Sequence, residues 1–124
     1  MSKSILLVDD EEMVTESLQR LLIKKGYEVT VANNGQAAVE LNKSNDFDLI
    51  ITDIRMPKLD GISTIKIIRS MMDAAGKNRV PEILITGYAR EEYMMEAQRL
   101  DVVDCLYKPI DIWVLLKSIK KAIG

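Results

Sequence analysis

The chain has 124 residues, close to the commonest size of a single domain, and 48% of them are apolar while 29% are charged. Such a composition is typical of a globular domain that buries a core without disulfides or a structural metal. Seventeen Lys and Arg are balanced by nineteen Asp and Glu, so the net charge is -2. This balance excludes the diffuse basic field of a DNA-binding domain.

The counts of histidine and cysteine exclude further classes of protein. Without histidine, the chain cannot be a Ser-His-Asp hydrolase, a zinc protein with histidine ligands or a carrier of phosphohistidine. Its one cysteine, Cys105, allows neither an internal disulfide nor a C-x-x-C pair, so we expect a reducing, cytoplasmic setting. No apolar run is long enough for a signal peptide or a membrane span, so we expect no membrane partner.

Five short apolar runs, each bounded by acids, Gly or Pro, predict strands that are buried on both faces of a sheet. In chain order these runs are residues 5–8, 28–32, 49–52, 82–85 and 105–107. The segments that follow them have apolar residues at helical spacing. This alternation predicts an α/β domain with a mostly parallel sheet and helices on both faces.

The five expected helices have recognisable starts or ends. The first ends near Gly26, where a left-handed cap is needed. Residues 33–35 open the second helix and residues 60–62 open the third. Residues 91–100 form the fourth, and Asp111 caps the last, which runs to about residue 123.

Polar side chains follow four of the five expected strands at their carboxyl ends. They are Asp9 and Asp10 after the first strand, Asp53 after the third, Thr86 after the fourth and Lys108 after the fifth. In an open parallel sheet, ligands bind outside the carboxyl ends, near a reversal of strand order. Two strand orders are common in such folds, and the order 2-1-3-4-5 gathers the three acids around the first reversal.

Three carboxylates in one place need a compensating positive charge. Two carboxylates about 4 Å apart repel each other by roughly 4 kcal/mol at an effective dielectric constant near 20. Lys108 supplies one positive charge, which leaves excess negative charge for a hard divalent cation bound through oxygen. We expect magnesium (Mg²⁺), with manganese (Mn²⁺) as its substitute.

Such a site suits the transfer of a phosphoryl group to a carboxylate. Asp53, alone at its strand end, is the expected nucleophile, and Asp9 and Asp10 are expected to hold the metal directly or through water. The Thr86 hydroxyl and the Lys108 ammonium would each take a phosphoryl oxygen.

At these positions the sequence resembles the receiver domains of two-component response regulators. Four segments carry the resemblance, in the family's order and spacing across the whole chain. They are Leu7-Val8-Asp9-Asp10-Glu11, Asp53-Ile-Arg-Met-Pro57 with Asp60-Gly61, Ile85-Thr86-Gly87-Tyr88-Ala89, and Tyr107-Lys108-Pro109. The resemblance implies one receiver domain over residues 1–124, with a flavodoxin-like, doubly wound sheet of five parallel strands in the order 2-1-3-4-5 and five helices.

The resemblance also implies a ligand set and a reaction. Asp53 would be the phospho-acceptor, and Mg²⁺ would bind to Asp10, Asp53 and the carbonyl of Arg55, with support from Asp9. A sensor histidine kinase or a histidine phosphotransfer protein would donate the phosphoryl group, which fits the absence of histidine here. The chain would be a signalling switch rather than an enzyme, catalysing only its own phosphorylation and dephosphorylation.

The output side of such a switch is an effector that the sequence does not identify, and we expect no direct binding of nucleic acid. Receiver domains commonly bind partners or dimerise through the fourth helix, fifth strand and fifth helix. Tyr93, Met94 and Trp113 are our candidates for that surface, although a helical methionine is more often part of a core. We expect either a stand-alone receiver or the input part of a longer regulator.

Several residues depart from the family's pattern. The usual aromatic residue three positions before the lysine is replaced by Cys105, which we expect to be a half-buried apolar residue rather than a reactive thiol. Tyr107 cannot replace that ring, because it lies two residues further along the strand. We therefore expect switching to depend on Thr86 and the loop after it, where Gly87 leaves the approach open and Tyr88 follows.

Three further positions flank these motifs. Arg55 and Tyr88 each lie two residues after a site residue, where their bulk either shields the phosphoryl group from water or simply lies in solvent. Asp101 stands where the family commonly has Gly before the fifth strand, which puts the geometry of that turn in doubt.

Other functions on a similar fold lack their motifs here. A flavodoxin-like redox carrier needs a Ser/Thr/Gly-rich phosphate loop after the first strand, where this chain has four acids at residues 9–12. A dinucleotide-binding domain needs G-x-G-x-x-G, which the glycines do not form. A phosphatase with an aspartate nucleophile usually has a second acid two residues on, where this chain has Arg55.

Overall fold

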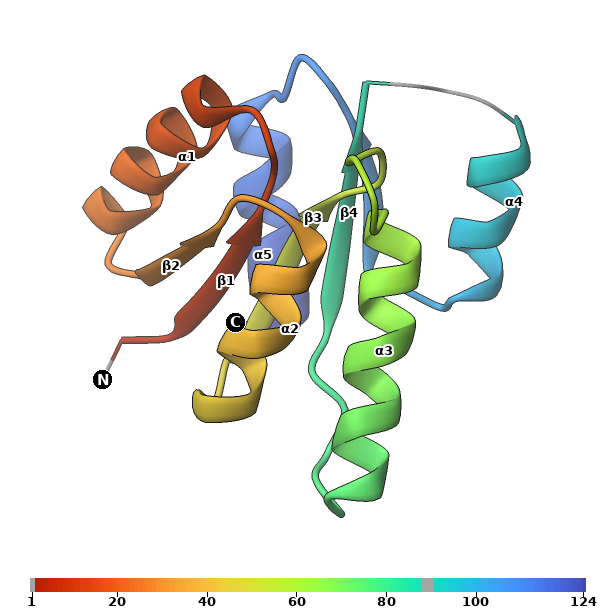
Figure 1. Cartoon of the computed structure of the whole chain (residues 1–124). Helices are drawn as coiled ribbons and strands as arrows, with labels where there is room; N and C mark the ends of the chain where they lie inside the picture. Colours follow the sequence, from red (N-terminus) through yellow and green to blue (C-terminus); the bar gives the residue numbers. More distant parts are fainter. Residues whose placement is uncertain (1, 88–90) are drawn as a thin grey trace.

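The computed structural model describes residues 2–87 and 91–124, with the backbone alone for residues 91–93. Over these residues, strands alternate with helices along the chain (Figure 1). The strands are β1 (Ser4–Val8), β2 (Glu28–Ala32), β3 (Leu49–Asp53), β4 (Glu82–Thr86) and β5 (Asp104–Tyr107). The helices are α1 (Glu12–Lys24), α2 (Gly35–Ser44), α3 (Gly61–Ala74), α4 (Glu91–Arg99) and α5 (Ile112–Ile123).

The strands form one parallel sheet in the order β2-β1-β3-β4-β5. Each of the helices α1 to α4 returns the chain to the starting edge of the sheet for the next strand, as parallel pairing requires. β1 and β3 are neighbours, with Val8 opposite Thr52, although β2 lies between them in the sequence. The predicted fold class and strand order are confirmed, and the strand order first reverses at β1 and β3.

Helices cover both faces of the sheet and fill the core. α1 and α5 contribute Leu22 and Ile119 to the core on one face. α2, α3 and α4 contribute Ala38, Ile65 and Ala97 to two clusters on the other face. Figure 1 shows α2 and α3 in front of the sheet and α5 behind it. Because both faces are covered, the carboxyl edge is where the central strands present polar groups.

The helix boundaries follow from local hydrogen bonding. Side-chain oxygens of Asn34, Asp60 and Asp111 accept hydrogen bonds from backbone N–H groups in the first turns of α2, α3 and α5, at 2.7, 2.7 and 2.9 Å. Gly26 follows α1 with φ of +95°, the left-handed conformation that glycine adopts without strain. These predicted starts and ends are confirmed.

The prediction that all five strands are buried on both faces is wrong for β2 and β5. β3 and β4 are buried throughout, whereas β2 and β5 consist mainly of partly exposed residues. β2 and β5 are the edges of the sheet, so each has one neighbouring strand and less helical cover. Strand position in the sheet therefore decides burial in runs that are similarly apolar in sequence.

The turn before β5 accommodates an aspartate where the sequence resemblance leads us to expect a glycine. Asp101 has φ of +58°, a left-handed conformation that Asp tolerates better than most residues. The Arg79 guanidinium donates hydrogen bonds to the carbonyl oxygens of Leu100 and Asp101, at 3.2 and 2.7 Å. These contacts hold the turn in the conformation that glycine would otherwise supply.

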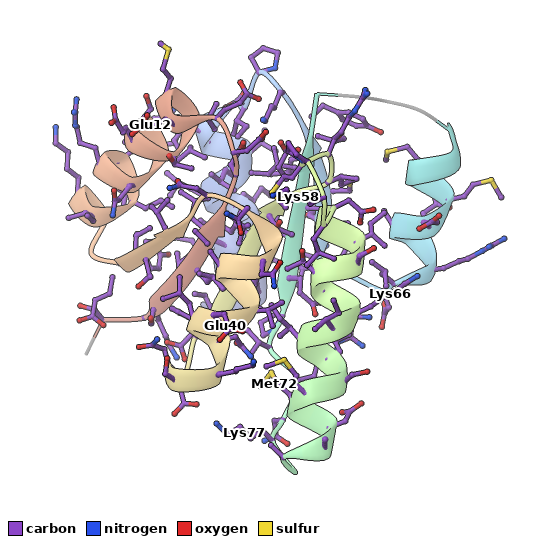
Figure 2. The ribbon with its side chains drawn as sticks, in the orientation of Figure 1. Glu12, Glu40, Lys58, Lys66, Met72 and Lys77 are labelled. Carbon is purple, nitrogen blue, oxygen red and sulfur yellow. The ribbon has the colours of Figure 1, made fainter. Side chains whose placement is uncertain are left out.

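The outer surfaces of the helices carry charged side chains, and some large apolar ones, such as Met13 and Trp113, are exposed there too. Glu40 projects from α2 and Lys66 from α3, and both are exposed (Figure 2). Within the described part of the chain, no helix has the length and apolar character that crossing a membrane requires.

Candidate functional site

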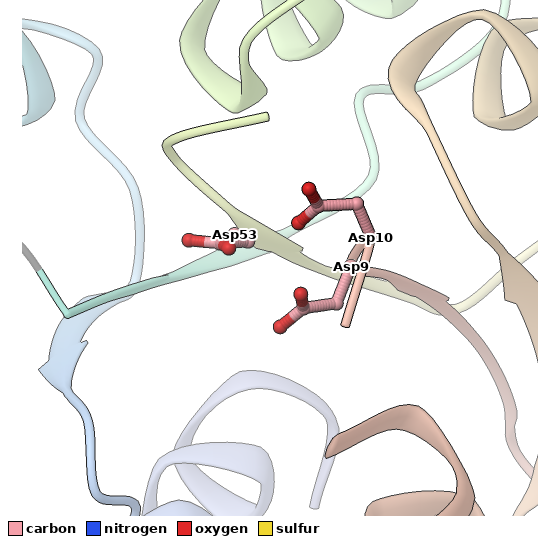
Figure 3. A group of neighbouring side chains, drawn as sticks. All are labelled: Asp9, Asp10 and Asp53. Atoms are coloured by element: carbon pink, nitrogen blue, oxygen red, sulfur yellow. The ribbon is translucent and has the colours of Figure 1, made fainter. Parts of the chain in front are cut away.

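The three predicted acids meet at the carboxyl edge of the sheet. Asp53 is the last residue of β3, and Asp9 and Asp10 directly follow β1, its neighbour. Carboxylate oxygens of all three lie within 4.8 Å of one another. Figure 3 shows the three side chains projecting in the same direction from the ends of these strands. The structure thus brings together the acids that the strand-end pattern predicted.

Burial makes this cluster electrostatically costly. Asp9 and Asp53 are 2% and 5% exposed, whereas Asp10 is exposed. The pKa of the Asp53 carboxyl is raised from 3.8 to about 6, chiefly by burial and then by the charge of Asp9, with the Lys108 ammonium opposing the rise. A bound cation would therefore favour the ionised form of the Asp53 carboxyl.

Lys108 is the cation that the structure places among these acids. Its Nζ lies 3.0 Å from Asp9 Oδ2, 3.2 Å from Asp53 Oδ2 and 2.6 Å from Glu11 Oε1. Burial alone would lower the pKa of Lys108, but hydrogen bonds to Glu11 and Asp9 and the charges of Asp53 and Asp9 raise it above its ordinary value. Its backbone N–H donates to the carbonyl oxygen of Thr86 at 2.8 Å, which fixes the segment after β5 beside β4.

Glu11 is a site residue to which the sequence motifs assign no role. Its contact with the Lys108 ammonium, at 2.6 Å, is the shortest of that group's three ion pairs. The sequence did contain a signal for this role: residues 9–12 are four consecutive acids, and the expected metal site uses only the first two of them. Which of the extra acids reaches the lysine depends on the turn into α1.

Asp53 is held by backbone as well as by charge. Its Oδ1 accepts a 3.4 Å hydrogen bond from the backbone N–H of Arg55. A Cβ atom on Gly61, at the start of α3, would overlap the carbonyl oxygen of Asp53. The N–H of Gly61 donates to the carbonyl oxygen of Ile54 at 2.7 Å. Close packing of α3 against the end of β3 therefore explains the glycine of the Asp60-Gly61 motif.

Thr86 and Gly87 lie at the neighbouring strand end. Thr86 is fully buried at the end of β4, opposite Tyr107, and Asp53 is opposite Ile85, one residue earlier in β4. A Cβ atom on Gly87 would lie 3.7 Å from side-chain carbons of Lys108, an ordinary contact. The predicted roles of Thr86 and Gly87 stay predictions.

The donor atoms of the cluster fit a hard divalent cation. Asp9, Asp10 and Asp53 offer only oxygen ligands, which Mg²⁺ and Mn²⁺ prefer over softer sites. One exposed and two buried carboxylates also leave room for the waters that Mg²⁺ retains. The Arg55 side chain is exposed, and the predicted use of its carbonyl as a ligand stays a prediction.

Cys105 packs as expected, as a half-buried residue against the cluster that contains Leu84. Burial, followed by the charge of Asp104, raises the pKa of its thiol, which disfavours the reactive thiolate. The Tyr107 side chain is 52% exposed, and its hydroxyl donates to Met94 Sδ at 3.7 Å. Tyr107 therefore lies outside the core position that an inward-turning ring would occupy.

Two of the candidate partner residues, Met94 and Trp113, have different neighbours in the structure. Met94, on α4, contacts Tyr107, whereas the Trp113 ring lies under the ammonium of Lys25, at the end of α1. Met94 and Trp113 line different hollows, and their predicted role in binding a partner stays a prediction. Tyr88 and the side chain of Tyr93, which the sequence also singled out, lie outside the described residues.

A family model now decides what this site belongs to. The model of the response regulator receiver domain matches residues 5–120, which include every acid of the cluster and Lys108. The chain belongs to the response regulator receiver domains. Receiver domains are signalling domains rather than enzymes in the usual sense, they bind Mg²⁺ at an acidic pocket, and they interact with histidine kinases and effector domains.

Curated relatives of this receiver domain are longer proteins. It is 37% identical over 120 residues to the transcriptional regulatory protein ZraR of Escherichia coli K12, and 38% identical over 119 residues to the regulatory protein AtoC of the same organism. These alignments cover 97% and 96% of this chain but 26% and 25% of the relatives. The receiver domain thus spans about a quarter of their length.

Solved structures share the fold of this receiver domain. A response regulator receiver protein from Pseudomonas putida gives a TM-score of 0.88 at 30% identity, covering 98% of both chains. The chemotaxis protein CheY4 of Vibrio cholerae gives a TM-score of 0.87 at 26% identity, covering 98% of this chain and 99% of that one. The fold is therefore the CheY-like flavodoxin fold that the sequence resemblance implied.

Proposed function

We propose that this receiver domain is a phosphorylation-controlled switch in a two-component phosphorelay, with Asp53 as the phospho-acceptor. The observation that carries the proposal is the setting of the Asp53 carboxylate. It lies within 4.8 Å of two further carboxylates and 3.2 Å from the Lys108 ammonium, at the carboxyl edge of the sheet. This setting supplies an oxygen nucleophile, a place for a metal and a cation for the incoming charge.

In the proposed reaction, an Asp53 carboxylate oxygen forms a bond to phosphorus while the phosphorus–nitrogen bond of a phosphohistidine breaks. The electron pair of that bond stays on the imidazole nitrogen, which takes up a proton from solvent. A pKa of about 6 leaves most of the Asp53 carboxyl ionised, and so nucleophilic, at neutral pH. The Lys108 ammonium would turn from the acids to a phosphoryl oxygen, and water would later release phosphate.

The residues fit a bound Mg²⁺, with Mn²⁺ as its substitute. Asp10 and Asp53 would hold the ion with the carbonyl of Arg55, and Asp9 would act directly or through water. When bound, the cation would neutralise the carboxylates and the transferred oxygens. Asp9 accepts a 2.9 Å hydrogen bond from the backbone N–H of Glu11, which orients its carboxylate beside the other two.

The phosphoryl donor, a sensor histidine kinase or a histidine phosphotransfer protein, would reach Asp53 from the side of Lys108. A hollow of about 590 Å³ lies there between the first turns of α1 and the segment after β5. Lys108 and Met13 both line it, and the Met13 side chain is 83% exposed. An apolar rim beside Lys108 suits docking of a partner helix.

A single unpaired cysteine suits the proposed cytoplasmic setting.

The conformational change on phosphorylation would be transmitted from Thr86 to the face formed by α4, β5 and α5. Thr86 pairs in register with Tyr107, and the Tyr107 hydroxyl contacts Met94 on α4. A shift of Thr86 toward the phosphoryl group would therefore reach α4 through Tyr107, while Cys105 stays packed. Met94 would take part in binding an effector or a second copy of the chain there, with Tyr93 on the same helix.

The decisive test measures intact mass after incubation with acetyl phosphate and Mg²⁺. The wild-type chain should gain one phosphoryl group, and chelating Mg²⁺ should abolish the gain. Asp53→Asn should gain none, whereas Asp46→Asn, the same chemical change at an exposed site, should behave as wild type. Phosphorylation of Asp53→Asn would refute the assignment of the phospho-acceptor.

A further inference from the structure

A groove between α5 and the end of α1 is not explained by phosphorylation at Asp53. Its volume is about 500 Å³. The residues that line it are Lys25, Tyr27, Trp113, Leu116, Lys117 and Lys120. None of them belongs to the acidic site or to the hollow beside Lys108. The groove is therefore a separate feature of this receiver domain.

The base of the groove is apolar and firmly packed. Tyr27 and Leu116 are partly buried and pack against the core under α1 and α5. Trp113 is 73% exposed, the second most exposed of the large apolar side chains that the structure describes. Exposed tryptophans beside a packed base are typical anchors of protein interfaces, because burying the ring removes a large apolar surface from water.

The charge of the groove is positive on a chain whose net charge is -2. Lys25, Lys117 and Lys120 are exposed, and no acidic residue lines the groove. Among the side chains that the structure describes, none of these lysines forms an ion pair. The Lys25 ammonium lies 5.6 Å from the centre of the Trp113 ring. The groove is therefore lined by three ammonium groups that form no ion pair with a described side chain and by one exposed aromatic ring, which lies beside the Lys25 ammonium.

We propose that this groove binds an acidic peptide segment of a partner protein. An apolar side chain of the segment would cover the Trp113 ring, and its carboxylates would pair with the lysines on either side. Lys117 and Lys120 lie one helical turn apart on α5, and Lys25 lies on the opposite wall. The charges are therefore spaced along two walls, which suits carboxylates that are distributed along a peptide. A single compact phosphate would instead need donors that converge on one point.

The expected affinity is modest and depends on salt. Exposed ion pairs contribute little each, and they are screened within about 10 Å at 0.1 M salt. Specificity for an acidic segment would therefore show as the difference between acidic and neutral peptides at low ionic strength. This proposal does not depend on phosphorylation of Asp53, so either proposal can fail without the other.

The tryptophan in the groove allows a direct measurement. Trp113 is the sole tryptophan of the chain, so its fluorescence reports on the groove. The probe is the peptide acetyl-EELELEE-amide, and its neutral counterpart is acetyl-QQLQLQQ-amide. We expect a saturable change of emission with the acidic peptide in low-salt buffer, an affinity at least about tenfold weaker near 0.5 M salt, and no saturable change with the neutral peptide.

Charge reversal in the groove should weaken binding selectively. Lys117→Glu combined with Lys120→Glu should lower the affinity for the acidic peptide about tenfold, because each replacement removes an attraction and adds a repulsion. Lys121→Glu is the matched control, since Lys121 is on the same helix but does not line the groove. Asp53→Asn should bind as wild type does. Far-ultraviolet circular dichroism confirms that each variant is folded.

Four results would overturn the proposal. The first is equal binding of the neutral peptide, and the second is a change of emission with protein concentration alone, which would assign the groove to a second copy of the chain. The third is an equal loss of affinity in Lys121→Glu and in the groove variant. The fourth is binding to vesicles with anionic lipid when the acidic peptide does not bind, which would indicate a membrane surface.

Discussion

Two buried carboxylates, one at the amino ends of the strands and one at their carboxyl ends, have opposite electrostatic surroundings. Glu82, the first residue of β4, is 2% exposed and accepts two 2.8 Å hydrogen bonds from the guanidinium of Arg69. Arg79 adds a second positive charge at 3.6 Å. Asp53, the last residue of β3, is 5% exposed and shares the Lys108 ammonium with Asp9 and Glu11.

The difference separates a structural charge from a functional one. At the amino ends of the strands, two guanidinium groups, of Arg69 and Arg79, lie near the one carboxylate of Glu82. The energetic cost of burying that carboxylate is therefore offset within the fold. At the carboxyl edge, one ammonium serves three acids, so negative charge remains uncompensated. Burial first, and then the charge of Asp9, raises the pKa of Asp53, and the uncompensated charge is the part of the electrostatics that a metal and a phosphoryl group can change.

The largest expected effect comes from breaking the compensated pair. Arg69→Met should lower the free energy of unfolding by about 3 kcal/mol, because it leaves the buried Glu82 carboxylate without its bidentate partner. Urea unfolding measures the change. Lys77→Met is the matched control: it removes an exposed pair with Asp46 and should cost less than about 1 kcal/mol. Equal losses in the two variants would mean that the Arg69 pair is not specially stabilising.

The second effect has the opposite sign and depends on pH. Asp53→Asn without divalent ions should raise the free energy of unfolding by about 2 kcal/mol at pH 7. An acid whose pKa is higher in the folded state destabilises the fold once it ionises. The gain should therefore be small near pH 4 and grow up to about pH 6, between the unfolded pKa of 3.8 and the folded value.

Asp46→Asn, at an exposed site, should show no such gain. Saturating Mg²⁺ should stabilise the wild type and reduce its difference from Asp53→Asn, since the ion binds the folded state. Thermal melts at several pH values, with and without Mg²⁺, measure both effects. A pH-independent gain would contradict the assignment of the raised pKa to Asp53.

The smallest effect concerns Glu11. Glu11→Gln removes the closest partner of Lys108 but leaves its contacts with Asp9 and Asp53. The ammonium is then freer to pair with an incoming anion, so the affinity for beryllofluoride at saturating Mg²⁺ should rise about two- to threefold. Glu12→Gln, the neighbouring acid on α1, is the matched control and should bind as wild type does. An unchanged affinity in Glu11→Gln would show that this pair does not restrain Lys108.

The arrangement of the sheet could be predicted because it depends on features that are visible in the sequence. These are the residues at strand ends, the helix caps and the order of strands and helices along the chain. Asp60 and Asp111 cap helices where the sequence placed them, and the acids meet because parallel strands end at one edge. The exposure of β2 and β5 could not be predicted from their own residues. Both runs are apolar, and their position at the edges depends on which strands pair.

In the site, residue types were predictable but the partners of long side chains were not. Asp53 and Lys108 are adjacent because of strand order, whereas Glu11 reaches the same ammonium only through the turn into α1. Trp113 was a candidate for the partner surface together with Met94, and its ring lies beside the ammonium of Lys25, at the end of α1. Rotamer and helix rotation decide such contacts, and neither is fixed by spacing along one helix.

The contact between α3 and the end of β3 limits which sequences this fold can accept. Any side chain at position 61 would collide with the main chain of the residue that we propose to be phosphorylated. Homologous domains with altered kinase specificity would therefore retain this glycine for steric reasons alone. Invariance at this position would report on the distance between two backbones, and it should not be counted as evidence for a chemical role.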